Sequence, residues 1–573
     1  MEAASTPASK PWLAQYPAGM PFDVNSDQLP TVVALMEQGF AQFAKRSAYV
    51  GMGTAFSFAD WDQRSTALAA WLQARGLQRG DRVALMLPNV LTYPVAMAAV
   101  LRAGCILVNL NPYASARELE HQLQDSGAKA IVVLETAAAR LQQVIANTAV
   151  QTVLVSAMSD LQPFMKGVLL NHMLRRVKRL VPAYSLPGHV LLAKALAEGA
   201  RLRFTPVPLQ PDDVALLQYT GGTTGLNKGA VLLHRNLIAK VLASEAWNQP
   251  GLQKKPVAGP LNIVCALPLH HVFAFVSCAL LGLRMGACNL LIANPRDLKL
   301  SIKALQPYKL HIVPAVNTLF KGLLQHPDFG LLNFSELLIS VGGGSPLQAA
   351  MAEDWQARTG CAIVQGYGLS ETSSGVTSDR TDTDHFTGTV GLPIPGVYIR
   401  ILSDDGHDLP PGEPGEVVIH GPQLMRGYWN QEAETRAAFT PDGGFRSGDI
   451  GVMDAQGQLK IVDRKKDMII VSGFKVYPAE VEAVVGSHPE VQECAVVGVP
   501  AEKSGEAVWL FVVRRDSELS EEVLDQFCAE QLSAYKRPRQ VCFVEALPKT
   551  SMGKLLRREL RVAAAAGNVS NGT

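Results

Sequence analysis

A glycine- and threonine-rich loop between two apolar runs constrains this chain more than any other feature. The first run covers residues 214–217, the second covers residues 230–233, and the segment between them contains T-G-G-T-T-G-L-N-K-G. The pattern predicts a strand, a loop and a second strand. Glycines let backbone N–H groups approach a ligand, threonine hydroxyls add donors and Lys228 adds positive charge, so the loop suits a polyphosphate. Taken alone, the stretch would also be explained by a turn without a ligand.

Two differences exclude a Walker loop. Lys228 comes three residues after Gly225 rather than directly after a glycine, and Gly229 stands where a serine or threonine should hold magnesium. The loop resembles instead the phosphate loop of the adenylate-forming superfamily, which includes acyl-CoA synthetases, luciferases and peptide-synthetase adenylation domains. The resemblance makes Thr223 a catalytic residue and a magnesium contact. The ATP contacts that it assigns are Thr220, Gly221, Gly222, Thr223, Thr224, Gly225 and Lys228.

Further motifs of that superfamily follow in its usual order. The motif A-L-P-L-H-H-V-F resembles one that places a catalytic residue, here His271, between the acyl pocket and the reacting carboxylate. The turn V-G-G-G-S-P is similar to one that lies along the adenine and the acyl group. In Q-G-Y-G-L-S-E-T the resemblance implies that Tyr367 stacks on adenine and that Glu371 is catalytic and binds magnesium. The nucleotide contacts assigned by these two motifs are Gly343, Gly344, Gln365, Gly366, Tyr367, Gly368 and Ser370.

The resemblance continues towards the C-terminus. In S-G-D, the carboxylate of Asp449 is expected to accept both ribose hydroxyls, because an ionised carboxylate offers only acceptors. Arg464 matches a ribose-contacting arginine, and Lys466 matches the hinge at which the family's small domain rotates. We therefore expect an AMP-binding domain over 1–464 and a small α/β domain over 465–573.

The small domain holds three further assignments, all implied by the resemblance. The family's catalytic lysine falls on Lys554. Gly473 leaves room for the pantetheine of CoA because it has no side chain. Lys536 is positioned to pair with CoA phosphates, although a basic surface residue is more often simply solvated.

Bulk properties narrow the class of protein. A chain of 573 residues calls for two or more domains, and helical patterns alternate with short apolar strands between residues 56 and 134. Both features predict an α/β fold. A net charge of +1 gives no electrostatic case for nucleic acid. The eight scattered cysteines without a C-x-x-C pair predict reduced, mostly buried thiols in a cytoplasmic protein.

Two segments bear on membranes. Residues 261–283 lack Asp, Glu, Lys and Arg, but Pro268 and two histidines interrupt them, so we expect a buried strand and helix and no membrane span. Residues 161–197 contain no acidic residue, and apolar side chains recur at helical spacing within 164–181. Such a basic amphipathic helix favours peripheral contact with anionic lipid on the inner face of the cell membrane. The alternative is a helix that packs its apolar face on its own domain.

The resemblance covers essentially the whole chain and is greatest to bacterial long-chain fatty acid CoA ligases. It implies that a long-chain fatty acid attacks ATP, with Mg²⁺ bound, to give acyl-adenylate and pyrophosphate, and that the acyl group then passes to CoA. It is also compatible with a homodimer. A medium-chain acid, an aryl acid or a carrier-protein acceptor would retain the first step. A membrane-associated fatty-acid-binding protein without catalysis would not need the acidic magnesium contact.

Overall fold

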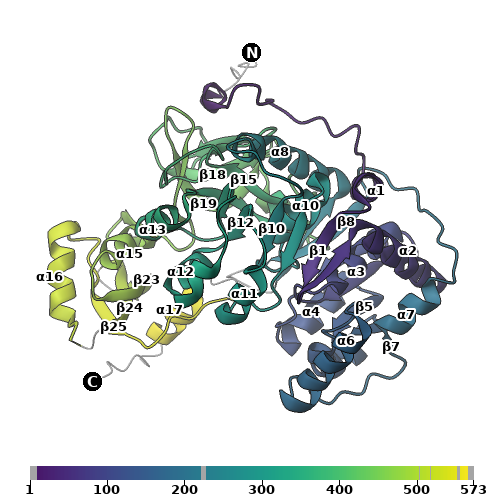
Figure 1. Cartoon of the computed structure of the whole chain (residues 1–573). Helices are drawn as coiled ribbons and strands as arrows, with labels where there is room; N and C mark the ends of the chain where they lie inside the picture. The colour runs from purple at the N-terminus through teal and green to yellow at the C-terminus, as the bar shows by residue number, and fades with distance from the viewer. Residues whose placement is uncertain (1–9, 221–226, 502–503, 516–517, 551–554, 566–573) are drawn as a thin grey trace. The chain divides into compact units, whose positions relative to one another are not determined.

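The computed structural model describes residues 10–220, 227–501, 504–515, 518–550 and 555–565 (Figure 1). The chain divides into two compact units. The first comprises Met1–Tyr398 and His420–Gly443, and the second comprises Ile399–Ile419 and Gly444–Thr573. Both units combine helices with sheets, so the predicted α/β class is confirmed.

A seven-stranded sheet forms one part of the first unit, in the order β7-β6-β5-β3-β4-β8-β9. Its neighbours run parallel except β8 and β9, which form an antiparallel pair around the glycine-rich loop. The central strands are apolar on both faces, as expected for a covered parallel sheet. The strands are β3 (Arg82–Met86), β4 (Ile106–Asn109), β5 (Ala130–Leu134), β6 (Thr152–Ser156), β7 (Val190–Leu191), β8 (Val214–Thr220) and β9 (Lys228–Leu233).

A nine-stranded sheet forms the other part, in the order β16-β15-β14-β13-β12-β10-β11-β1-β2. Its middle strands run parallel, whereas both ends turn antiparallel. The strands are β1 (Ser47–Gly51), β2 (Thr54–Ser57), β10 (Asn262–Cys265), β11 (Cys288–Leu291), β12 (Ile312–Ala315), β13 (Ile339–Gly342), β14 (Ile363–Leu369), β15 (Ser374–Ser378) and β16 (Leu392–Pro393).

Helices cover these sheets, and α2, α3 and α7 pack together (Figure 1). Helices α9 and α10 join through a π-helical segment into one buried stretch after β10, so the strand and helix predicted for 261–283 are confirmed. The helices are α1 (Val32–Phe43), α2 (Phe58–Ala74), α3 (Thr92–Arg102), α4 (Ala116–Ser126), α5 (Ala138–Val144), α6 (Phe164–His172), α7 (Leu192–Gly199), α8 (His234–Leu252), α9 (Val272–Ala274), α10 (Leu281–Met285), α11 (Leu298–Leu305), α12 (Asn317–Gln325), α13 (Ala349–Thr359) and α14 (Glu432–Ala438).

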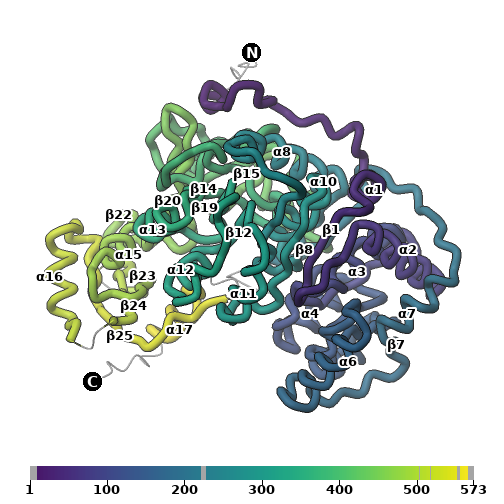
Figure 2. The backbone as a smooth tube through the Cα atoms, viewed as in Figure 1, coloured from purple at the N-terminus to yellow at the C-terminus, as the bar shows by residue number. Residues whose placement is uncertain are grey.

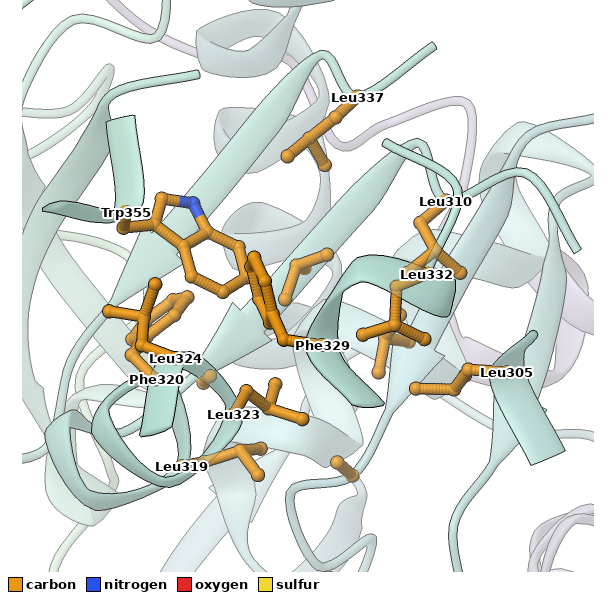
Figure 3. Packing of buried hydrophobic residues seen from close by; sticks show 14 of the residues in the cluster. Leu305, Leu310, Leu319, Phe320, Leu323, Leu324, Phe329, Leu332, Leu337 and Trp355 are labelled. Atoms are coloured by element: carbon orange, nitrogen blue, oxygen red, sulfur yellow. The ribbon is translucent and has the colours of Figure 1, made fainter. Parts of the chain in front are cut away.

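An aromatic cluster holds α12 and α13 against the nine-stranded sheet (Figure 3). The rings of Phe320 and Trp355 pack edge to face with their centroids 4.7 Å apart, and Phe329 lies 5.8 Å from the same indole. Edge-to-face packing suits the ring quadrupoles and buries a large apolar area. The cluster also includes Ala315 and Leu347, so it supports β12 and the turn that follows β13.

The second unit contains two sheets. The four-stranded sheet has the order β17-β18-β19-β20, and the other joins β22-β21-β24-β23 with β25 beside β24. The predicted domain boundary after Arg464 falls between these two sheets and stays a prediction. The strands are β17 (Tyr398–Leu402), β18 (Gly415–His420), β19 (Phe445–Met453), β20 (Leu459–Arg464), β21 (Ile469–Val471), β22 (Phe474–Val476), β23 (Val491–Ala501), β24 (Gly505–Arg514) and β25 (Gln540–Phe543); the helices are α15 (Pro478–Gly486), α16 (Glu521–Gln531) and α17 (Arg557–Ala565).

Two other expectations concern the whole chain. All eight cysteines are free and seven of them are buried, as the absence of paired spacing predicted. Across the described ranges, no helix combines the length and the apolar character needed to cross a bilayer. The basic segment 164–181 forms α6 and one π-helical turn, Met173–Val177, and Figure 2 shows the chain continuing from there to β7 and α7.

Candidate active site

The glycine-rich loop joins β8 to β9, as predicted. Thr220 is the last residue of β8 and pairs with Lys228, the first residue of β9. The loop residues assigned to ATP between them lie outside the described residues; they are Gly221, Gly222, Thr223, Thr224 and Gly225. The groups that surround the two ends of the loop form the described part of the site.

Helix α4 holds both ends of the loop, although the motifs gave no sign of it. Tyr219, at the end of β8, donates its hydroxyl to Asp125 Oδ2 at 2.6 Å. Beyond the loop, the carbonyl of Asn227 lies 3.0 Å from Nε2 of His121. Because a carbonyl only accepts, His121 must carry its proton on Nε2. Burial and then Asp125 raise the pKa of Tyr219, which keeps the phenol protonated as the donor.

A second network joins the loop lysine to the predicted magnesium ligand. Tyr428 donates its hydroxyl to Glu371 Oε1 at 2.9 Å. Lys228 lies over the ring of Tyr428, with Nζ 5.1 Å from the ring centroid, and forms an ion pair with Glu434. Burial and then Glu371 raise the pKa of Tyr428, so its hydroxyl stays a donor. The sequence motifs identified Lys228 and Glu371 but not Tyr428, which lies in the short run Gly427-Tyr428-Trp429.

The glycine turn after β13 passes close to two other elements. A Cβ at Gly343 would lie 3.2 Å from Cε1 of Phe273 and 3.4 Å from the carbonyl oxygen of Gly366. Gly344 has a φ of +81°, in the left-handed region that glycine adopts without strain. Gln365 steadies the turn, because its Oε1 accepts from the backbone N–H of Leu347 at 3.2 Å. The turn therefore lies against β14 and α9.

Strand β14 needs glycine at another assigned position. A Cβ at Gly368 would lie 2.1 Å from the carbonyl oxygen of Ser374, so only glycine permits this pairing with β15. Tyr367 precedes it on the same strand and is partly exposed, whereas Glu371 follows in a short 3₁₀ turn that begins at Ser370 and is largely buried. Tyr367, assigned to adenine, therefore lies on β14. Ser370, assigned to the nucleotide, and Glu371, assigned to magnesium, lie on the turn that follows this strand.

The segment around His271 is fixed by two buried residues, Asn89 in the connection after β3 and Tyr93 on α3. Asn89 donates to the carbonyls of Cys265 and Leu267, both at 2.9 Å, and accepts from the backbone N–H of Leu269 at 2.8 Å. Tyr93 donates its hydroxyl to the carbonyl of Leu269 at 2.8 Å. Leu269 lies two residues before His271, so these bonds set the path of the segment.

The two neighbouring histidines have different surroundings. His271 precedes α9 and accepts from the backbone N–H of Phe273 through Nδ1 at 3.3 Å. His270 is half-buried, and burial lowers its pKa to about 4, so the ring is neutral near pH 7. The carbonyl of His270 accepts from Gln218, on β8, at 3.1 Å. The histidine segment is thereby attached to the strand that enters the phosphate loop.

The second unit contains the two residues assigned to ribose. Asp449 and Arg464 face each other across β19 and β20, and Arg464 Nε lies 2.8 Å from Asp449 Oδ1. Ser447 orients this strand, because its hydroxyl accepts from the backbone N–H of Asp449 at 3.0 Å and donates to the carbonyl of Val417 at 2.6 Å. The serine of S-G-D therefore positions the carboxylate.

The other assignments in the second unit lie after β20, around its five-stranded sheet. Lys466 follows β20, and burial and then Arg464 lower the pKa of its amine. Gly473 lies between β21 and β22 with a φ of +83°, and a Cβ there would meet no described atom within 4 Å. Lys536 pairs with Glu480 at 2.5 Å, which competes with the predicted contact to CoA. Lys554 lies outside the described residues.

Comparison with known proteins agrees with this arrangement. Residues 36–429 match the AMP-binding enzyme family, and residues 480–554 match the AMP-binding enzyme C-terminal domain. The chain belongs to the AMP-binding enzyme family. The predicted superfamily is therefore confirmed, and ATP and CoA are consistent with it as substrates.

Individual relatives point to one subgroup. A protein of Escherichia coli O6:H1 named "Long-chain-fatty-acid--CoA ligase" is 47% identical over 98% of this chain and 99% of its own length. A protein of the same name from Salmonella typhimurium is 46% identical, also over 98% of this chain and 99% of its own length. The crystal structure of ATP-bound MatB from Rhodopseudomonas palustris has a TM-score of 0.76 at 27% identity and covers 93% of this chain and 99% of that one. The predicted likeness to bacterial long-chain ligases is confirmed.

The contacts of α4 generate a prediction about ATP. We expect Asp125→Ala to raise the KM for ATP by about ten- to hundredfold, because removing a charged acceptor leaves the buried hydroxyl of Tyr219 unpaired at the base of the loop. Tyr219→Phe removes the donor instead, so its effect should be smaller and should not add to that of Asp125→Ala. Steady-state kinetics of the two single variants and the double variant measure this coupling. Fully additive effects would show that the contact does not position the loop.

Proposed function

We propose that this chain is a long-chain fatty acid–CoA ligase that works in two steps at one site. In the first step, a carboxylate oxygen of the fatty acid attacks the α-phosphorus of ATP, the bond to the β-phosphate oxygen breaks, and pyrophosphate leaves. In the second step, the thiol of CoA attacks the acyl carbon, AMP leaves, and the thiol proton passes to solvent. The observation that carries the proposal is the joined Lys228–Tyr428–Glu371 network beside the phosphate loop.

The first step must bring a carboxylate against an anionic triphosphate, so charge has to be neutralised. Lys228 supplies one positive charge and would exchange Glu434 for phosphate oxygens when ATP binds. Lys554, Thr223 and Thr224 are proposed as further donors to the phosphates. His271 is proposed to lie beside the reacting carboxylate, and Asp449 with Arg464 to hold the ribose.

Glu371 fits a magnesium contact. In the described part of the chain no lysine or arginine pairs with its carboxylate, and no group of three or more acidic, histidine or cysteine side chains forms a closed metal cage. Mg²⁺ suits such a site, because it commonly binds through one or two carboxylates plus substrate phosphates. When bound, the ion would offset the negative charge of the phosphates. Tyr428 would orient the carboxylate through its 2.9 Å hydrogen bond.

The second step needs space for a thiol where Lys554 has acted. We propose that rotation at Lys466 withdraws Lys554 and brings the open surface at Gly473 to the acyl-adenylate. Gly473 supports this role because no described atom occupies the space beside it. Lys536 would contact CoA phosphates only after releasing Glu480.

The proposed function is tested by pyrophosphate release from the purified protein with ATP and Mg²⁺. Acids from acetate to oleate and several aryl acids are compared, with and without CoA. We expect release to be greatest with long chains, since each buried methylene contributes about 0.8 kcal/mol, and acyl-CoA to form only when CoA is present. A maximum with aryl or short acids would change the substrate, and acyl-adenylate that CoA cannot discharge would point to a carrier-protein acceptor. Binding of fatty acid without pyrophosphate release would indicate a non-catalytic binding protein.

The two-step proposal predicts that Lys554 acts in only one half-reaction. We expect Lys554→Ala to slow adenylation by about 100- to 1000-fold or more, because a group that stabilises developing charge is lost. The same variant should transfer added acyl-adenylate to CoA at close to the normal rate. Lys549→Ala is the matched control, since Lys549 is a nearby lysine whose amine pairs with Glu493. Equal loss in both half-reactions would contradict the alternation.

We also propose that the basic segment 164–181 binds anionic lipid, which would place the protein peripherally on the inner face of the cell membrane. Phe164 and Leu169 are 80% and 70% exposed, so α6 does not bury its apolar side chains on its own unit. Arg176 and Arg179 of the same segment are also exposed. Arg175 differs, because it pairs with the buried Glu135 at 2.6 Å. The homodimer stays a prediction, because contacts within one chain do not test it.

Vesicle binding tests this proposal. We expect Arg176→Gln with Arg179→Gln to weaken sedimentation with phosphatidylglycerol vesicles by about thirtyfold, because each basic residue near an anionic surface contributes about 1 kcal/mol. Phe164→Ser should also weaken binding, whereas neither change should affect pyrophosphate release in detergent. The matched control is Arg201→Gln with Arg203→Gln, two exposed arginines outside the segment. Equal loss in both double variants would show that binding depends on surface charge in general and not on the segment 164–181.

A further inference from the structure

The turn that holds Glu371 is followed by two residues in an unusual backbone conformation. Ser373 and Ser374 have φ angles of +53° and +101°, which residues with a side chain rarely adopt and glycine adopts freely. Ser373 is fully buried and ends the 3₁₀ turn Ser370–Thr372. Such strain persists only where the surrounding contacts fix it, and it is concentrated at functional sites. The proposed function assigns no role to either serine.

One segment of the first unit holds this turn at three points. The buried hydroxyl of Ser373 donates to the carbonyl of Gln423 at 2.7 Å. The backbone N–H of Met425 donates to the carbonyl of Glu371, also at 2.7 Å. The hydroxyl of Tyr428 donates to the carboxylate of Glu371 at 2.9 Å. The backbone of Glu371 and its carboxylate are therefore both fixed by the same segment.

The same segment pairs with β9, the strand that leaves the phosphate loop. The backbone N–H of Arg426 donates to the carbonyl of Val231 at 3.0 Å, and the N–H of Val231 donates to the carbonyl of Gly427 at 2.9 Å. Residues 423–428, which we call the linking segment, thus join the turn of Glu371 to the strand beyond the phosphate loop. A metal ion bound with ATP has to contact the carboxylate and the phosphates together, so this link fixes two parts of one site.

We propose that Ser373 is a positioning residue for metal binding: its hydroxyl holds the turn on the linking segment and keeps the carboxylate of Glu371 where it binds magnesium. The inference rests on the proposed function, which assigns the metal to Glu371. Mg²⁺ requires short bonds in near-ideal octahedral geometry, so a small displacement of its carboxylate ligand weakens binding. Without the hydroxyl, the carbonyl of Gln423 loses this donor and the turn loses a contact that fixes it.

Binding of Mn²⁺, a paramagnetic substitute for Mg²⁺, tests the inference without turnover. The protein is held in excess over ATP with no fatty acid present, and free Mn²⁺ is measured by electron paramagnetic resonance. We expect Ser373→Ala to raise the dissociation constant of Mn²⁺ from the protein–ATP complex by about five- to tenfold, because a buried hydrogen bond is lost. Transfer of added acyl-adenylate to CoA, which needs no metal, should stay within about twofold of the normal rate. Glu371→Gln gives the loss expected when the carboxylate itself is removed.

Two further variants isolate the hydroxyl. Ser373→Gly removes it without backbone strain, because glycine adopts a φ of +53° freely. This variant should weaken Mn²⁺ binding as much as Ser373→Ala, and it serves if the alanine variant fails to fold. The matched control is Ser301→Ala on α11, which removes another buried hydroxyl that donates to a carbonyl, that of Asp297 at 2.8 Å. It should leave Mn²⁺ binding unchanged.

The outcomes separate this inference from the proposed function. Mn²⁺ affinity within about twofold of the unaltered protein in either folded Ser373 variant would overturn the role of the hydroxyl, while loss in Glu371→Gln would leave the proposed metal contact standing. Acyl transfer slowed as much as Mn²⁺ binding is weakened would also overturn it, because a general structural defect affects both. Unchanged Mn²⁺ affinity in Glu371→Gln would instead overturn the metal contact of the proposed function.

Discussion

The site depends on buried hydrogen bonds that join the two sheets of the first unit. Asn89, which is 4% exposed, satisfies two carbonyls and one N–H of the segment between β10 and α9. The carbonyl of Leu267 and the N–H of Leu269 belong to no regular element, so they would otherwise be buried without partners at a cost of several kcal/mol. The hydroxyl of Tyr93 bonds to the same segment. It also lies 2.9 Å from Oδ1 of Asn109, which orients the side chain. These bonds fix the position of His271, which precedes α9.

A second level of organisation links charges rather than backbone. Tyr428 contacts a cation through its ring and an anion through its hydroxyl, so one side chain sets both Lys228 and Glu371. The phenol can do this because its apolar ring and polar tip act independently. Helix α4 similarly holds Tyr219 and Asn227, the described residues at either end of the phosphate loop. The substrate phosphates would thus meet groups that are already in place, which lowers the reorganisation needed during reaction.

The sequence alone predicted a large part of this protein. Strand–loop–strand around the phosphate loop, the strands before and after α3, and the buried helix after β10 are all confirmed, because apolar periodicity and glycine placement act within a few residues. The ordered motifs also identified the family and most assigned residues. Their roles remain proposals, since a motif names a residue type and not its contacts.

Other features were decided only by the tertiary structure. His121 lies 106 residues from Asn227, Asp125 lies 94 residues from Tyr219, and Tyr428 lies 57 residues from Glu371. No local pattern records such pairs, because they exist only once separate elements pack side by side. The exposure of Phe164 is likewise a property of packing, because the same side chain at the same helical position would give the same sequence pattern if another element covered it.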